Sequence, residues 1–165
     1  MIITFIITYS LGSAIIGSRV RARDTSRKTH LANIVRALEL YINDHGSYPL
    51  SNANGQIVGC GDPASPTACT WGQAWTDSNG TQYMKLPADP TNSANYYYNS
   101  NGVAWQLYAR IEKTDDPDID NNGDGVYVAE DDDFPACGTT GVCSCGTGDC
   151  NYTVVSGNTL PGAVL

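Results

Sequence analysis

The first fifty residues constrain the fold more than any other part of this chain, because an uncharged apolar segment runs directly into an amphipathic one. Residues 1–16 (MIITFIITYSLGSAII) carry no charge, and a basic run, RVRARDTSRK, follows almost at once. The apolar segment is shorter than the roughly 20 residues that cross a bilayer alone. It also lacks the charged start of a signal peptide. We therefore expect residues 1–24 to form an apolar helix that is buried in a membrane or among copies of itself.

The segment from Thr25 to Asp44 predicts a helix with one apolar face. Apolar residues recur there at steps of three and four, and Gly46 and Pro49 end the pattern. If the helix is continuous from Ile2 to His45, it is about 65 Å long at 1.5 Å per residue, more than a domain of this size can cover. The predicted apolar face consists of Leu31, Ile34, Val35, Leu38, Tyr41 and Ile42. The side chains expected to point elsewhere are Arg27, Lys28, His30, Arg36, Glu39 and Asn43.

Charge is distributed very unevenly along the chain, which has a formal net charge of −8. The junction between the two segments is basic, with Asp24 as its single acid against Arg19, Arg21, Arg23, Arg27 and Lys28. A basic junction beside an apolar segment suits an anionic membrane surface or a helical partner. The remainder is acidic, so we predict no specific binding of nucleic acids.

All six cysteines lie between Cys60 and Cys150, which indicates an exported domain held by disulfides. Zinc is disfavoured because the spacing of Cys143-Ser-Cys145 is too short for a usual zinc half-site, and no histidine is near it. Cys60 and Cys69 bound a short loop, and we predict a disulfide between them. The last four cysteines allow three pairings, of which 143–145 is sterically awkward; they are Cys137, Cys143, Cys145 and Cys150. Two disulfides there would hold a Cys-rich C-terminal segment, residues 136–165.

A β-hairpin is predicted in the middle of the chain. Residues 96–98 form one strand, Asn99–Gly102 the turn and Val103–Ile111 the return strand, because an Asn-Gly pair flanked by aromatic and β-branched residues is a strong hairpin signal. Tyr127 and Val128 are expected to begin a third strand. The sheet would pack on the apolar face of the helix, which gives an α+β head over residues 25–135.

The acidic segment between Glu112 and Asp133 holds ten acidic residues and one lysine. Its first part matches half of an EF-hand loop, although Ala129 stands where a strict match needs Glu and Glu130 is one residue late. A hard divalent cation would offset the repulsion among these carboxylates. We predict a Ca²⁺ site there, with a solvated acidic loop as the alternative. The predicted ligands are Asp118, Asp120, Asn122, Asp124 and Glu130.

Other motifs narrow the functional classes. The chain has no C-x-x-C-H motif, so no haem is expected. No nucleotide cofactor is expected either. Neither histidine has a nominated Ser, Cys or carboxylate partner, so the chain is not expected to be an enzyme. Asn79-Gly-Thr81 and Asn151-Tyr-Thr153 match the N-glycosylation acceptor pattern, with Asn79 and Asn151 as the acceptor residues.

The apolar start and three later stretches together resemble the type IV pilin superfamily, which includes the major pseudopilins of type II secretion. The later stretches are ARDTSRKTHLANIVRALELYINDHGSYP, KLPADP and YYYNSNGVAWQLYARIE, and the likeness covers roughly residues 1–115. The resemblance implies a long N-terminal helix whose apolar half projects from a small antiparallel sheet. GDGVYVAEDDD is also similar to the segment in which major pseudopilins carry a calcium site.

This resemblance implies a structural role: an extracellular pilus-like filament, a helical homopolymer assembled through the apolar helix. The partners it implies are the inner membrane before assembly and a pilus or secretion assembly machinery. The alternatives are a pseudopilin of a type II secretion system, or a monomeric membrane-tethered module that binds calcium and adheres. The expected assembly interface is Ile2, Ile3, Phe5, Ile6, Ile7, Leu11, Ile15 and Ile16.

The start of the chain departs from the family pattern. Family members have a short basic leader that ends in Gly, followed by a residue that is usually Phe and an acidic residue shortly after it. No such junction precedes Asp24 here. Either Met1 is an internal start or this member has lost the processing site. We expect the first, because a basic flank on the body side alone would hold the body in the cytoplasm.

Overall fold

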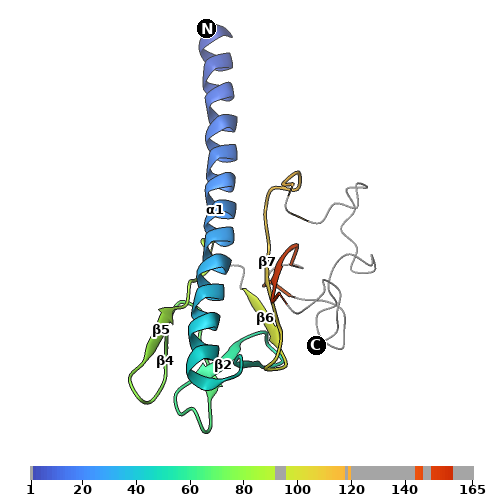
Figure 1. Ribbon diagram of the computed structural model, residues 1–165. Helices are drawn as coiled ribbons and strands as arrows, with labels where there is room; N and C mark the ends of the chain where they lie inside the picture. Colours follow the sequence, from blue (N-terminus) through green and yellow to red (C-terminus); the bar gives the residue numbers. More distant parts are fainter. Residues whose placement is uncertain (1, 92–95, 118, 120–143, 147–149, 158–165) are drawn as a thin grey trace.

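The fold joins one long helix to a set of short strands. The computed structural model describes residues 2–91, 96–117, 119, 144–146 and 150–157, with the backbone alone for residues 2–16. The helix, α1 (Ile2–His45), precedes eight strands in the described residues. Figure 1 shows the strands gathered beside the C-terminal half of α1. The architecture is therefore α+β, as the sequence predicts.

Helix α1 ends where the sequence predicts. Gly46 adopts a left-handed backbone conformation (φ 77°), and its N–H donates to the carbonyl of Ile42 at 2.7 Å. Glycine takes this conformation without the steric cost that a Cβ imposes. Pro49 follows and cannot donate a backbone hydrogen bond. The 44 residues of α1 span about 65 Å.

Strands β6 (Tyr97–Ser100), β7 (Trp105–Ala109) and β8 (Tyr152–Val155) form one antiparallel sheet in that order. β6 and β7 are the predicted hairpin, so that prediction is confirmed. The third strand, β8, comes from near the end of the chain, whereas the predicted third strand at Tyr127 and Val128 lies outside the described residues.

The predicted position of the hairpin turn is wrong by two residues. Ser100 still pairs with Trp105 in the ladder, so the turn runs from Asn101 to Ala104. The side-chain oxygen of Asn101 accepts the N–H groups of Val103 (3.0 Å) and Ala104 (2.9 Å). This Asx turn, with Gly102 in the left-handed region, makes Asn101 the first residue of the turn, whereas the sequence predicts Asn99.

Two smaller sheets lie between α1 and the hairpin in sequence. The first contains β1 (Leu50–Ser51), β2 (Ile57–Cys60) and β3 (Thr67–Ala68), and the second contains β4 (Ala74–Thr76) and β5 (Gln82–Lys85). A disulfide joins Cys60 to Cys69, which confirms the predicted pair. The indole of Trp75 donates to the carbonyl of Gly59 at 2.9 Å and so links the two sheets.

A second disulfide, Cys145–Cys150, packs against the buried ring of Tyr108 on β7. It lies just before β8 in sequence and supports a disulfide-bonded C-terminal region. Of the three pairings that the sequence allows, this is one of the two that avoid 143–145. Cys137 and Cys143 lie outside the described residues.

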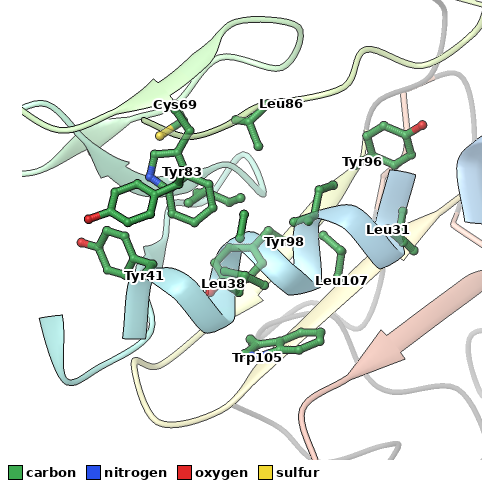
Figure 2. Packing of buried hydrophobic residues seen from close by; sticks show 14 of the residues in the cluster. Leu31, Leu38, Tyr41, Cys69, Tyr83, Leu86, Tyr96, Tyr98, Trp105 and Leu107 are labelled. Carbon is green, nitrogen blue, oxygen red and sulfur yellow. The ribbon is translucent and has the colours of Figure 1, made fainter. Parts of the chain in front are cut away.

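The core forms between the apolar face of α1 and the strands. Leu31, Ile34 and Leu38 are completely buried and Tyr41 nearly so. Figure 2 shows the core side chains of α1 beside Tyr98 and Leu107 of the sheet. The remaining members of the predicted face, Val35 and Ile42, are half-buried. The prediction of the apolar face is therefore confirmed for its central residues.

Truncating Leu38 to alanine should lower the free energy of unfolding by about 2–5 kcal/mol, because the change leaves a cavity in a close-packed core. Leu40, two residues away on the same helix, is 55% exposed. Leu40→Ala should therefore change stability by less than about 0.5 kcal/mol. Urea unfolding followed by circular dichroism compares the two variants, and equal losses would contradict this packing.

Candidate functional site

The most highly charged feature of the described fold lies where α1 enters the body. We call this ion-pair cluster the collar. In it, three cations of α1 meet one carboxylate of α1 and three from later parts of the chain, one after β5 and two after β7. Its members are Arg23, Asp24, Arg27, Lys28, Asp89, Glu112 and Asp116.

Arg27 is the centre of the collar and is only 2% exposed. Its guanidinium forms a two-point contact with Asp89, with Nε donating to Oδ2 at 2.6 Å and Nη2 to Oδ1 at 3.1 Å. Nη1 donates to Asp24 Oδ1 at 2.8 Å and to Glu112 Oε1 at 2.6 Å. Burial alone would lower the pKa of Arg27, but the hydrogen bonds to Asp89 and Glu112 outweigh it and raise that pKa. The guanidinium is therefore charged inside the fold and donates four hydrogen bonds to three carboxylates.

Asp24 connects the collar to the backbone beyond β7. Its two carboxylate oxygens accept the N–H groups of Glu112 (2.9 Å) and Lys113 (3.0 Å). The carboxylate is also almost completely buried. A buried carboxylate is tolerated when each oxygen has a donor. The single acid of the basic run thus fixes the chain after β7 against the helix.

Asp89 gives the LPADP motif a structural role. Besides Arg27, its Oδ1 accepts the backbone N–H of Thr91 at 2.8 Å and the Thr91 hydroxyl at 2.6 Å. Burial would raise the pKa of Asp89, but the bonds from Arg27 and Thr91 outweigh burial and lower it. The motif therefore supplies a buried, ionised partner for the helix.

The outer part of the collar is partly exposed. Glu112 also pairs with Arg23, whose Nε donates to Oε1 at 2.7 Å. The bonds from Arg23 and Arg27 lower the pKa of Glu112 to about 2. Lys28 pairs with Asp116 at 2.6 Å. Its ammonium nitrogen also lies 5.5 Å from the centre of the Tyr152 ring, so this residue of β8 contacts the helix.

Arg27 and Lys28 correct the prediction that these side chains point away from the core. With Arg23, they direct their charge into the fold, whereas Arg19 and Arg21 are exposed. A signal for this was present in the sequence. Residues 24, 27, 31, 34, 38 and 41 follow one another at steps of three and four, so Asp24 and Arg27 continue the buried face.

The two histidines bind tyrosines. His30 Nδ1 lies 2.6 Å from the Tyr96 hydroxyl, and His45 Nε2 lies 2.8 Å from the Tyr83 hydroxyl. His30 is half-buried, so its predicted place on the polar face is wrong. Burial lowers the pKa of His30, which favours the neutral imidazole. Both histidines therefore join the helix to aromatic residues of the body.

The other predicted site residues are distributed as follows. Asn79 is exposed, in the turn between β4 and β5, and Asn151 uses its side-chain amide to bond to the backbone N–H and carbonyl of Ile111. The eight residues of the expected assembly interface belong to α1, but only their backbone is described. The five predicted calcium ligands lie outside the described residues, so the calcium site stays a prediction.

The calcium prediction has a direct test. Adding Ca²⁺ should raise the thermal midpoint of unfolding and a chelator should reverse the rise, because a ligand that binds the native state alone stabilises it. The double variant Asp120→Asn, Asp124→Asn is the control and should respond less. An unchanged midpoint in the unaltered chain would contradict the prediction.

Comparison with known proteins assigns no relative, since no family model, curated protein or solved structure matches this chain. Across the described ranges, no three His, Cys, Asp or Glu side chains are grouped so that they could hold a metal ion. Within those ranges no helix is long and apolar enough to cross a membrane.

Proposed function

We propose that this chain is the structural subunit of an extracellular type IV pilus-like filament and that it polymerises through its apolar N-terminal segment. One observation carries the proposal. Helix α1 is a single unbroken helix of 44 residues, and among its described side chains the first to bond to the body is Arg23. Gly17, Ser18 and Arg19 are exposed. In Figure 1 the N-terminal half of α1 extends beyond all the strands.

The energetics favour burial of that half by other molecules. Its sequence is apolar and uncharged through Ile16, and each Å² of apolar surface removed from water contributes roughly 25 cal/mol. The described strands lie beside the other half of the helix. Neighbouring copies of the same helix would cover it and form a filament core.

The same segment would be held in the membrane between export and assembly. Lipid chains and a helix bundle are both apolar, so transfer from one to the other costs little free energy. The disulfide-bonded body would then lie outside the membrane, consistent with an oxidising compartment.

The collar supports this role because a helical polymer needs every subunit to hold the same shape. Ion pairs from Arg23, Arg27 and Lys28 fix the body to α1 at the point where the helix leaves it. The direction of the projecting half relative to the body would therefore be set within each subunit before assembly.

Negative-stain microscopy of sheared surface fractions tests the proposal. Cells that produce the unaltered chain should yield long filaments of uniform diameter. Ile7→Asp should abolish them, because it places a charge in the apolar core, where such a residue costs about 2.5–3.5 kcal/mol in a lipid setting. The matched control is Leu40→Asp, an exposed position on the same helix, which should still assemble.

A second measurement distinguishes assembly from folding. The thermal midpoint of the body should be the same in Ile7→Asp and the unaltered chain, which separates an assembly defect from unfolding. Filaments formed by Ile7→Asp, or no filaments from the unaltered chain, would contradict the proposal. Short assemblies confined to the cell envelope would favour a pseudopilin instead.

A further inference from the structure

A groove on the body, separate from the collar, has the chemistry of a saccharide site. Its volume is about 340 Å³, and it is lined by Asn54, Gln56, Thr70 and Trp71. Small-molecule pockets range from about 300 to 1,000 Å³, so the groove suits a ligand as small as a mono- or disaccharide. Two amides, a hydroxyl and an indole surround it, and none of these four side chains is charged.

Trp71 is distinct among the three tryptophans of the chain. Trp75 and Trp105 are at most 2% exposed and belong to the core. Trp71 is only partly buried, and its ring is held edge-to-face with the buried Tyr96 at 5.6 Å between centroids. A fixed and partly accessible indole gives an apolar face on which the C–H side of a sugar ring can pack.

The amide side of the groove is also held in place. Asn52 Oδ1 accepts the N–H groups of Asn54 (3.0 Å) and Gln56 (2.9 Å), and Asn52 Nδ2 donates to Gln56 Oε1 at 2.9 Å. The carbonyl of Gly55 accepts the N–H of Tyr98 at 2.9 Å, which fixes this loop to β6. A ligand would therefore bind without the cost of ordering the loop.

The opposite side is fixed by the first disulfide. Thr70 and Trp71 directly follow Cys69, which is bonded to Cys60. The N–H of Gln73 donates to the carbonyl of Thr70 at 3.1 Å, which closes a turn with Gly72 in the left-handed region (φ 83°). Thr70 is exposed, so its hydroxyl stands at the rim of the groove.

We propose that this groove binds a neutral saccharide, with Trp71 packing on the sugar ring and with Asn54, Gln56 and Thr70 hydrogen-bonding its hydroxyls. A sugar presents both an apolar C–H face and several hydroxyls, and the lining offers a matching surface to each. A charged ligand would find no opposite charge among the lining residues, and an apolar ligand would offer no hydrogen-bond partner to the polar side chains of Asn54 and Thr70.

An oligosaccharide array tests the proposal on the full chain in a non-glycosidic detergent. The array carries neutral, sialylated and sulfated glycans. The unaltered chain should bind the neutral glycans. When a glycan is bound, acrylamide should quench the fluorescence of Trp71 less than it does in the free chain. Asn54→Ala should weaken the affinity about tenfold, which corresponds to the loss of one good hydrogen bond.

Further variants distinguish recognition from folding. Trp71→Ala should abolish binding and Trp71→Phe should restore part of it, because phenylalanine still offers an aromatic face. Gln73→Ala is the matched control, since Gln73 is an exposed amide in the same turn and does not line the groove. Thermal midpoints verify that each variant folds. Retention of charged glycans alone, retention of none, or binding unaffected by Asn54→Ala would overturn the proposal.

Discussion

Replacing Arg27 with methionine should lower the free energy of unfolding of the body by about 3–5 kcal/mol, the usual cost of breaking a buried ion pair. Methionine fills most of the arginine's space, so the expected loss comes from charge rather than from a cavity. Without the guanidinium, Asp89 and Asp24 would remain as buried carboxylates with fewer donors. Urea unfolding of the full chain in detergent, followed by circular dichroism, measures this loss.

Two further variants distinguish pairing from a general effect of losing an arginine. Arg36 lies on the same helix, is exposed, and has one long side-chain bond, to Asn33 at 3.3 Å. Arg36→Met should change stability by less than about 0.5 kcal/mol. Arg27→Lys should fall between the two, because an ammonium group keeps the charge but loses the two-point contact with Asp89. Equal losses in Arg27→Met and Arg36→Met would show that the collar contributes nothing.

Periodic features of the fold were predictable from the sequence. The apolar face of α1 repeats at helical spacing, and Leu31, Ile34 and Leu38 are all completely buried. The left-handed glycine that ends α1 and the Cys60–Cys69 disulfide are equally local, because each depends on residues close together in the sequence. Local signals of this kind need no knowledge of the tertiary fold.

The collar was not predictable in the same way because its partners are distant in sequence. Arg27 and Asp89 are 62 residues apart, and Arg27 and Glu112 are 85 apart. Composition places Arg27 in a basic run and suggests an exposed charge. Its helical position, four residues before Leu31, suggests burial, and the structure shows that position outweighs composition. A charged residue on an apolar stripe is thus a signal for a buried ion pair.

The sequence predicts the antiparallel hairpin, but neither its register nor the strand that pairs with β7 on the other side. The predicted hairpin is present, but its turn lies two residues later in the chain because the Asn101 side chain forms an Asx turn. The third strand, β8, follows a disulfide late in the chain and pairs with β7 from Gln106 to Ala109. Pairing between such distant segments leaves little trace in the sequence of either strand.

Acid should release the outer part of the collar and destabilise the body. The hydrogen bonds from Arg23 and Arg27 lower the pKa of Glu112 from its ordinary 4.5 to about 2. A depressed carboxyl pKa stabilises the fold above the pKa of the unfolded chain, and that contribution disappears as pH falls through the folded value. The stability from Glu112, about 1–3 kcal/mol, should therefore be complete near neutral pH and be lost between about pH 4.5 and about pH 2.

Glu112→Gln isolates this contribution from that of the other carboxyl groups, which titrate in the same range. Glutamine resembles the protonated glutamic acid in shape and is likewise uncharged, so the variant mimics the acid form at every pH. The difference in unfolding free energy between the unaltered chain and Glu112→Gln should be largest near pH 7 and shrink toward zero near pH 2. Asp115→Asn is the matched control, because Asp115 is 81% exposed and pairs only with Lys113 among the described ion pairs. A difference that stays constant across this range would contradict the assignment of this stability to the ionised carboxylate of Glu112.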